Sequence, residues 1–334
     1  MKVIILCNSA MHYRSVYSKT VLEEMKTVPD MDYARYSIED IAANPARFAD
    51  VEFIFSTWGM PALSEEEIRQ YFPRLKCLFY AAGSVQAFAR PFLNCGVKVF
   101  SAWAANGVSV AEYTVAQIIL ANKGFFTLTS LMSQKRLDEA NKIKLSYPGN
   151  FKEKIGLIGC GMIGSLVAEL LKQYDLEVLA FDPYMSDEKA ARLNVRKCSL
   201  EELFSSCSVI SNHLANKKAT EKMLRYEHFA SMRPYSTFIN TGRGAQLIEE
   251  DLVRVLTERP DMVALLDVTH PEPAPLSHPF YTLPNCFMTP HIAGSILSGE
   301  QVRMAEFMLE EYNSYISGQP CKYEVTEKML ETMA

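Results

Sequence analysis

The sequence predicts an α/β protein built from two doubly wound domains, each with a parallel sheet. Short β-branched and aromatic runs alternate with longer amphipathic stretches, which is typical of parallel strands covered by helices. This alternation occurs as two series, one in the first third of the chain and one from residue 154 onward. The 334 residues also correspond to about two domains of ordinary size.

The first series predicts one small α/β unit. Its strands are expected at residues 3–7, 51–56, 77–81 and 97–101. Helices are expected at residues 18–28 and 64–72, and the second of these begins with Ser64 and Glu67, a pair that can cap its free amides. A broad apolar stripe then predicts a long helix over residues 104–121.

The second series predicts a larger unit. A Lys-rich stretch at residues 135–144, expected as a solvated helix, and a turn cluster at residues 147–150 precede it. Its strands are expected at residues 155–158, 177–181, 209–212, 237–240, 262–266 and 286–288, with helices at residues 165–172 and 298–316.

The composition disfavours several classes of protein. Lys and Arg number 34 against 39 Asp and Glu, and no run of five like charges occurs, so we expect no nucleic acid partner. The eight cysteines form no Cys-x-x-Cys pair, which is typical of a reducing compartment. The sequence has no apolar stretch long enough to span a membrane, and its first residues are too short an apolar run for a signal peptide. A cytoplasmic protein without membrane partners is therefore expected.

The sharpest motif is a glycine-rich turn between the strand 155–158 and the helix after it. In a dinucleotide-binding turn the first glycine permits a tight turn, the second lets a pyrophosphate approach the backbone, and the third permits close helix packing. The amino terminus of the helix then faces the diphosphate. A plain glycine turn is the alternative interpretation. The motif reads Gly159-Cys160-Gly161-Met162-Ile163-Gly164.

An acidic residue at the end of the next strand favours the dinucleotide interpretation. Asp182 follows Gly164 by 18 residues. Its carboxylate would accept hydrogen bonds from the ribose hydroxyls and repel a 2′-phosphate, which favours NAD over NADP. No arginine occurs at residues 183–191 to reverse that preference.

Three side chains suited to hydride-transfer chemistry follow predicted strands. Arg243 stands between two glycines, Glu272 lies in a Pro-rich loop, and His291 follows Thr289-Pro290. Hydride transfer at a carbon that bears oxygen needs an acid/base group and a cation for a carboxylate or carbonyl. Because open α/β sheets bind ligands beyond the carboxyl ends of their strands, we expect these three residues to form the site.

Four segments, in this order, resemble the D-2-hydroxyacid dehydrogenase family, whose members include phosphoglycerate dehydrogenase and glyoxylate/hydroxypyruvate reductases. They are the glycine turn with Asp182, the segment around Arg243, the segment from Asp267 to Pro273, and the segment from Thr289 to Gly294. Residues 80–85 and 105–114 resemble family segments as well, so the likeness runs from about residue 50 onward. It implies two Rossmann-like or flavodoxin-like domains with the active site in a cleft between them.

The resemblance implies a role for each matched residue. His291 is the general acid/base, Glu272 orients its imidazole, and Arg243 binds the substrate. The reaction implied is hydride transfer between NAD(H) and a small 2-oxo or D-2-hydroxy acid. The implied cofactor-binding residues are Gly159, Gly161, Met162, Ile163, Gly164, Asp182, His213, Thr220, Thr241 and Asp267, and Ala82, Gly83 and Ser84 would hold the substrate carboxylate.

Two segments depart from the family pattern. The stretch from His213 to Thr220 keeps the histidine and the last threonine, but it lacks the usual proline and first threonine. Gln86 stands where an acidic residue usually follows the substrate loop. The substrate pocket is therefore expected to differ from that of the best-known members. No second basic residue in the recognised loops indicates a phosphorylated substrate, and the acid stays open among glyoxylate, hydroxypyruvate, pyruvate and sugar-derived acids.

The resemblance also implies how the chain is divided and assembled. Residues 1–104 and 297–334 would form a discontinuous substrate-binding domain, and residues 105–296 the NAD-binding domain. A homodimer formed through the NAD-binding domain is implied, with the helix 104–121 as a contributor.

Three alternatives compete with this assignment. An NAD(H)-sensing interaction protein is the main one, because the family resembles corepressors that keep the same fold and site residues. Formate dehydrogenase is disfavoured, because Glu272 stands where those members have glutamine. A metal site is disfavoured too, because the spacings of His270, His278 and His291 match no zinc pair; His270 and His278 are expected to face solvent.

Overall fold

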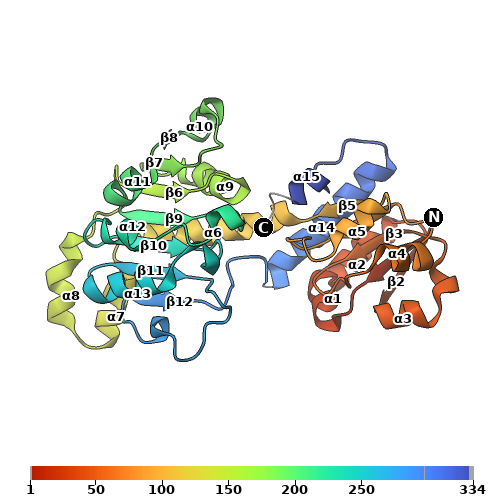
Figure 1. Cartoon of the computed structure of the whole chain (residues 1–334), viewed down its shortest axis with the longest axis horizontal. Helices are drawn as coiled ribbons and strands as arrows, with labels where there is room; N and C mark the ends of the chain where they lie inside the picture. The colour runs from red at the N-terminus through yellow and green to blue at the C-terminus, as the bar shows by residue number, and fades with distance from the viewer. Residues whose placement is uncertain (1, 297, 331–334) are drawn as a thin grey trace. The chain divides into compact units, whose positions relative to one another are not determined.

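The chain forms two compact units, each with its own sheet (Figure 1). The structure, a computed structural model, describes residues 2–296 and 298–330. Unit 1 comprises Met1–Gly107 and Ser295–Ala334, and unit 2 comprises Val108–Gly294. Of the segments predicted for the substrate-binding domain, residues 1, 297 and 331–334 lie outside the described residues.

Unit 1 is a six-stranded sheet in the order β13-β5-β4-β3-β1-β2. Its strands pair in parallel except β13, which pairs antiparallel with β5. The strands are β1 Lys2–Leu6, β2 Met31–Tyr36, β3 Val51–Ser56, β4 Cys77–Tyr80, β5 Lys98–Ser101 and β13 Glu324–Val325. The α-helices are α1 Ala10–Val16, α2 Lys19–Glu24, α3 Ile38–Ala43, α4 Glu65–Tyr71, α5 Ala89–Asn94, α14 Ser298–Ile316 and α15 Glu327–Leu330.

Helices cover both faces of the unit 1 sheet because alternate strand residues point to opposite sides. Helices α3, α4, α5 and α15 pack on one face over residues such as Ile54 and Leu78. Helices α1, α2 and α14 pack on the other, where Phe53, Phe55 and Phe79 meet Tyr312 of α14. The chain thus returns after unit 2 to complete one of the two cores of unit 1.

Unit 2 is a seven-stranded sheet in the order β12-β11-β10-β9-β6-β7-β8, and every pair is parallel. The strands are β6 Lys154–Ile158, β7 Glu177–Phe181, β8 Val195–Lys197, β9 Val209–Asn212, β10 Thr237–Asn240, β11 Val263–Leu266 and β12 Cys286–Met288. The α-helices are α7 Phe125–Ser133, α8 Leu137–Ile143, α9 Met162–Leu171, α10 Asp187–Leu193, α11 Leu200–Ser206, α12 Tyr226–Ala230 and α13 Glu249–Glu258; α6 (Trp103–Asn122) begins in unit 1 and ends in unit 2.

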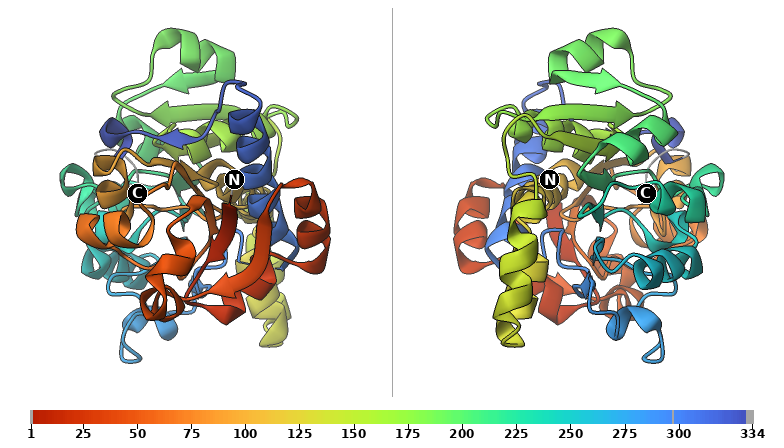
Figure 2. Two further views of the ribbon diagram at one scale, coloured as in Figure 1. Left: turned by 90° about the vertical axis from the view of Figure 1, so that its right-hand side faces the viewer. Right: turned by 90° about the vertical axis from the view of Figure 1, so that its left-hand side faces the viewer.

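The unit 2 sheet is likewise covered on both faces, and Figure 2 shows the ribbon from two further directions. Apolar residues of α6, α9 and α10 fill one face, and those of α11, α12 and α13 fill the other. The predicted fold class, two parallel-sheet α/β domains, is confirmed.

The predicted strands agree with the structure, but three further strands were not predicted. They are β2, β8 and β13, and each of them has only one buried residue. All three lie at a sheet edge, where a strand buries little and needs no apolar run. The prediction of a helix over residues 165–172 began too late, because α9 starts at Met162 with Gly161 as its N-cap.

The predicted helix cap at Ser64 is confirmed. The Ser64 hydroxyl accepts from the Glu67 amide, and the Glu67 carboxylate accepts from the Ser64 amide in return. These two bonds satisfy amides that the first turn of α4 leaves free. The predicted Lys-rich helix is α8, followed by a 3-10 turn, and most of its residues are exposed.

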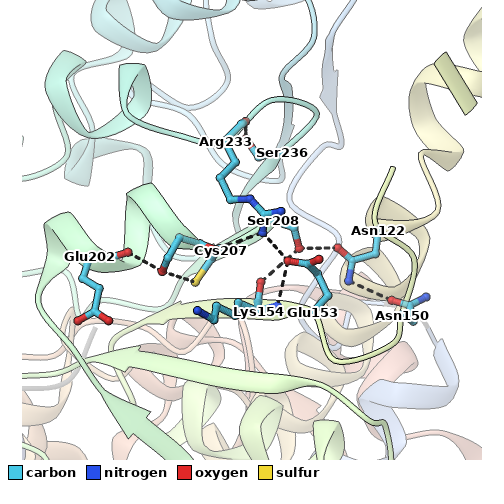
Figure 3. Close-up of polar contacts among 10 residues, drawn as sticks. Asn122, Asn150, Glu153, Lys154, Glu202, Cys207, Ser208, Arg233 and Ser236 are labelled. Carbon is cyan, nitrogen blue, oxygen red and sulfur yellow. Dashed lines mark hydrogen bonds and ion pairs between the residues drawn. The ribbon is translucent and has the colours of Figure 1, made fainter. Parts of the chain in front are cut away.

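A polar network ties the amino ends of β6 and β9 to neighbouring elements (Figure 3). The Ser208 hydroxyl donates to Oδ1 of Asn122 at 2.8 Å and also contacts the Lys154 carbonyl. Asn122, the last residue of α6, is joined in turn to Asn150. Nearby, Arg233 pairs with Glu153, whose side chain is 15% exposed. The network lies at the edge of the sheet opposite to the glycine turn, so we interpret it as structural.

Two findings concern the chain as a whole. The eight cysteines are free thiols. Within the described residues no single helix has the length and apolarity needed to cross a membrane; the bent pair formed by α6 and α7 meets the criterion by length and composition alone.

We predict that Ser208→Ala destabilises unit 2. The substitution removes a buried hydroxyl and leaves Oδ1 of Asn122 without that donor, at a cost of about 1–3 kcal/mol. The free energy of unfolding from urea titration measures the effect. Ser205→Ala, at an exposed position of α11, is the matched control and should change stability by less than about 0.5 kcal/mol. Equal stabilities of the two variants would contradict the prediction.

Candidate functional site

The three predicted catalytic residues follow three neighbouring strands of unit 2. In the register of the sheet Asn240 of β10 pairs with Leu266 of β11, and Leu266 pairs with Met288 of β12. Arg243 comes three residues after Asn240, Glu272 six after Leu266, and His291 three after Met288. Because the strands are parallel and in step, their loops all leave the same edge of the sheet.

Glu272 and His291 form a direct pair. Nδ1 of His291 lies 2.5 Å from Oε1 of Glu272, and the two side chains are 45% and 38% exposed. A carboxylate at this position keeps the ring proton on Nδ1 and fixes the orientation of the ring. No described residue hydrogen-bonds Nε2, which is therefore the nitrogen that can exchange a proton with a ligand.

The loop that carries His291 is held by the buried carboxylate of Asp267, which is 3% exposed. Its Oδ1 accepts from the Thr289 hydroxyl at 2.6 Å and from the Ile292 amide at 2.8 Å, while Oδ2 accepts from the Ala293 amide at 2.9 Å. Between these anchors His291 adopts a left-handed conformation with φ 54°. Asp267 therefore orients the His291 loop, and its contact with the cofactor stays a prediction.

Thr289 has a second partner that sequence reasoning missed. The hydroxyl of Tyr113, on α6, lies 3.0 Å from that of Thr289. Thr114, beside Tyr113, lies 3.4 Å from the hydroxyl of Thr241, a predicted cofactor residue that is buried. Helix α6 thus contacts two of the site loops.

The loop of Arg243 is shaped by three buried amide side chains that were not singled out from the sequence. Nδ2 of Asn212 donates to Oδ1 of Asn240 and to Oε1 of Gln246, and Gln246 in turn accepts from the Arg243 amide at 3.1 Å. All three side chains are fully buried. The available signal was the asparagine that ends each of two buried strands, β9 and β10.

The Arg243 guanidinium has no carboxylate partner among the described residues. Its Nη1 donates to the Gly242 carbonyl at 2.8 Å, which leaves the other donors available. The next residue, Gly244, lies against the segment that leads to Glu272: an added Cβ would be 2.1 Å from the Thr269 carbonyl carbon. Only glycine permits this approach, so the Arg243 and Glu272 loops are in contact.

The glycine turn has the shape that a dinucleotide requires. Gly159 has φ 86°, and a Cβ on Gly164 would lie 2.1 Å from the Gly159 carbonyl oxygen, so both positions need glycine for packing. A Cβ on Gly161 would meet nothing within 4 Å. A Cβ at Gly161 would therefore clash with no atom of the protein, and the open space there fits an approaching pyrophosphate. Met162 and Ile163, the next two residues, bring the first free amides of α9 to this space.

Asp182 lies at this turn, as predicted. Its Oδ2 accepts from the Cys160 amide at 2.8 Å, and its Oδ1 accepts from the Tyr184 amide at 2.9 Å. Each carboxylate oxygen has capacity for further donors such as ribose hydroxyls. Lys189 donates to the carbonyl of Cys160, whose buried thiol has its pKa raised to about 12 and so stays protonated.

His213 lies against the glycine turn from the side of β9. Its carbonyl oxygen is 3.0 Å from where a Cβ of Gly159 would be. Burial lowers the pKa of its imidazole to about 4, and its Nε2 is buried with no partner in the described structure. The hydroxyl of Thr220, by contrast, has acceptors within the protein, because it lies within hydrogen-bond distance of the Ala215 and Lys217 carbonyls. Contacts of either residue with the cofactor stay predictions.

The predicted carboxylate-binding residues belong to unit 1. Ala82, Gly83 and Ser84 follow β4, and the hydroxyl of Ser101 on β5 donates to the Ala82 and Gly83 carbonyls. The amides of Gly83 and Ser84 have no acceptor among the described residues. These two amides, at the carboxyl end of a parallel strand, suit an anionic group.

One expectation about the other histidines was wrong. His270 has an exposed side chain, but the side chain of His278 is only 19% exposed, because it packs on Phe280 and faces Glu249. In the part of the chain that the structure describes, no three His, Cys, Asp or Glu side chains are grouped as a metal ion requires.

The fold and the glycine turn define a dinucleotide-binding protein of the doubly wound α/β class. Residues 115–293, more than half of the chain, match the family described as D-isomer specific 2-hydroxyacid dehydrogenase, NAD binding domain. The chain belongs to the D-2-hydroxyacid dehydrogenase family, and NAD is its cofactor.

Individual relatives agree with this family. A formate dehydrogenase from Chaetomium thermophilum is 30% identical over 233 residues, which are 67% of this chain and 62% of that protein. A glyoxylate reductase from Thermofilum pendens is 29% identical over 213 residues, which are 63% and 62% of the two chains. The matched segments thus span less than two thirds of these relatives.

A solved structure shows the same fold over nearly the whole length. It is the NAD complexed form of a D-isomer specific 2-hydroxyacid dehydrogenase from Lactobacillus delbrueckii ssp. bulgaricus, with a TM-score of 0.78 and 18% identity. The likeness covers 98% of this chain and 100% of that chain.

The glycines predict a contrast between two variants. Gly161→Ala should leave stability unchanged, because its Cβ meets no protein atom, but should weaken NADH binding by about 1–3 kcal/mol through a clash with the cofactor. Gly164→Ala should instead destabilise the fold, because its Cβ would overlap the Gly159 carbonyl. Thermal unfolding and NADH titration by fluorescence separate the two effects. Unchanged NADH affinity of Gly161→Ala would argue against binding at this turn.

The buried His213 predicts a dependence of stability on pH. Its imidazole has a folded-state pKa of about 4 against 6.5 for the unfolded chain, so the unfolded chain binds the proton more readily between these values. Stability should therefore fall as pH drops from 6.5 toward 4, by at most about 3 kcal/mol from this residue. Unfolding by urea at pH 7 and pH 4.5 should show a smaller loss for His213→Gln than for the wild type.

Proposed function

We propose that the protein is an NAD-dependent oxidoreductase that transfers a hydride between NAD(H) and a small 2-oxo or D-2-hydroxy acid. The observation that carries the proposal is the Glu272–His291 pair, at the same sheet edge as an Arg243 guanidinium that no carboxylate neutralises. An acid/base pair beside a free cation suits a substrate that has both a reactive oxygen and a carboxylate. Bound NADH would supply the hydride to C2 of the acid.

In this proposal His291 moves the proton. In the direction of reduction, Nε2 of protonated His291 donates its proton to the oxygen on C2, and the neutral ring keeps its proton on Nδ1 against Glu272. In oxidation the neutral Nε2 takes the proton back. Glu272 holds the ring in one tautomer and stabilises its charged form.

Arg243 would hold the substrate oxygens. Its guanidinium can donate to a carboxylate and to the carbonyl oxygen at once, which orients C2 and polarises the carbonyl as the hydride arrives. The free amides of Gly83 and Ser84 would bind the carboxylate from unit 1. A cleft between the domains, a homodimer, a cytoplasmic location and the absence of nucleic acid and membrane partners stay predictions that accompany the proposal.

The proposal predicts that His291→Ala loses turnover and keeps NADH binding. Removal of a general acid/base costs about 10²–10⁴-fold in rate. The assay is NADH oxidation with a panel of glyoxylate, hydroxypyruvate, pyruvate and larger 2-oxo acids; formate with NAD is included because a formate dehydrogenase is among the relatives. His270→Ala is the control, because it removes an exposed imidazole from the loop that carries Glu272 and keeps the backbone amide of that position.

Two outcomes would count against the proposal. Tight NADH binding with no turnover of any acid would favour the NAD(H)-sensing interaction protein. Turnover that survives in His291→Ala would show that another group moves the proton.

A further inference from the structure

A buried glutamate outside the predicted site lies where the Arg243 and Glu272 loops meet. Glu249 is the first residue of α13 and is 5% exposed. Its Oε1 accepts a hydrogen bond from the backbone amide of His270 at 2.8 Å. Its Oε2 lies 3.5 Å from Nε2 of His278. One carboxylate therefore contacts two separate parts of the loop that follows β11.

This contact is close to both proposed site loops. His270 precedes Glu272 by two residues, and prolines at 271 and 273 restrict the backbone on either side of Glu272. Gly244 packs on the backbone of Thr269 and His270, so the loop of Arg243 lies against the same segment. The hydrogen bond from the His270 amide to Glu249 therefore fixes the start of the Pro-restricted segment that carries Glu272. It also fixes the backbone against which the Arg243 loop packs.

The environment of His278 favours an ionised Glu249. Nδ1 of His278 accepts from the Phe280 amide at 3.3 Å, so in the neutral ring the proton is on Nε2. That N–H faces Oε2 of Glu249. An ionised Oε2 presents a lone pair to this N–H, whereas a proton on Oε2 would be repelled by it. The ring is kept in place by Phe280, whose ring centroid is 4.4 Å away.

Burial acts in the opposite direction. It raises the pKa of the Glu249 carboxyl to about 7, Glu250 adds to the rise, and the His270 amide opposes it. The thiol of Cys286 is a further titratable group close enough to interact with Glu249, and burial raises its pKa to about 12. An ionised acceptor makes a hydrogen bond about twice as strong as a neutral one, so the hold on His270 tightens as pH rises through about 7.

We propose that Glu249 is a positioning residue of this enzyme: its carboxylate holds the His270 amide and so sets Glu272 against His291 and supports the loop of Arg243. The inference rests on the proposed function for its effect on turnover. Glu249 acts through Glu272 and does not touch the substrate.

Glu249→Gln tests the proposal, because it keeps the size of the side chain and removes its charge. We expect kcat for reduction of the best 2-oxo acid to fall about fivefold, with KM for NADH unchanged. In the wild type, ionisation of Glu249 should contribute a rise of kcat with pH near 7, and Glu249→Gln should lack that rise. Glu250→Gln is the matched control, since Glu250 is an exposed carboxylate in the same helical turn, and it should behave as the wild type.

A second measurement is independent of any substrate. Nitrogen-15 NMR should show the proton of neutral His291 on Nδ1 in the wild type and in Glu250→Gln, and a mixture of tautomers in Glu249→Gln. In His270→Ala, which removes the imidazole beside this amide and keeps the amide itself, the backbone amide signal of residue 270 should also shift with pH near 7. If no acid is turned over, the proposed function fails while these signals still test the positioning role. Wild-type His291 signals and pH profile in Glu249→Gln, or a residue 270 amide in His270→Ala that does not shift with pH near 7, would overturn it.

Discussion

Polar groups buried at the ends of strands must find hydrogen-bond partners, and the carboxyl edge of the unit 2 sheet is organised by that requirement. The Asp267 carboxylate accepts hydrogen bonds from two backbone amides and a hydroxyl of the His291 loop, and these bonds hold that loop in place. Asn212, Asn240 and Gln246 do the same for the loop of Arg243. The positions of His291 and Arg243 thus depend on the hydrogen bonds that buried polar side chains make with the loops that carry them.

The amino ends and the carboxyl ends of the unit 2 strands have different roles. At the amino ends of β6 and β9, Ser208, Asn122 and the Arg233–Glu153 pair join elements that meet no predicted ligand. At the carboxyl ends, three glycines, Asp182 and the Arg243, Glu272 and His291 loops face outward from the sheet. This separation lets the loops of one edge carry unfavourable conformations, such as the left-handed His291, while the other edge contributes stability.

The sequence was sufficient for the fold class, the interior strands and the glycine turn, because each of these depends on a local pattern. The edge strands β2, β8 and β13 were missed because they bury little and so have no apolar pattern to find. The pairing of Glu272 with His291 agrees with the role that the resemblance implied. The amide network around Gln246 and the partner of His278 were beyond sequence reasoning, because their residues are far apart in the chain and meet only through the register of the strands.

The insertion of unit 2 into unit 1 has a consequence for the order of folding during synthesis. All strands and helices of unit 2 have been made when the ribosome reaches Gly294, and domains generally fold as units once complete. Unit 1 began first, but Met304, Met308 and Tyr312 of α14, which cover one face of its sheet, are made last. Phe53, Phe55 and Phe79 therefore lack that cover throughout the synthesis of unit 2. During this interval only α1 and α2 are available to cover that face of the sheet, so the aromatic side chains that α14 buries in the finished protein stay accessible to a chaperone.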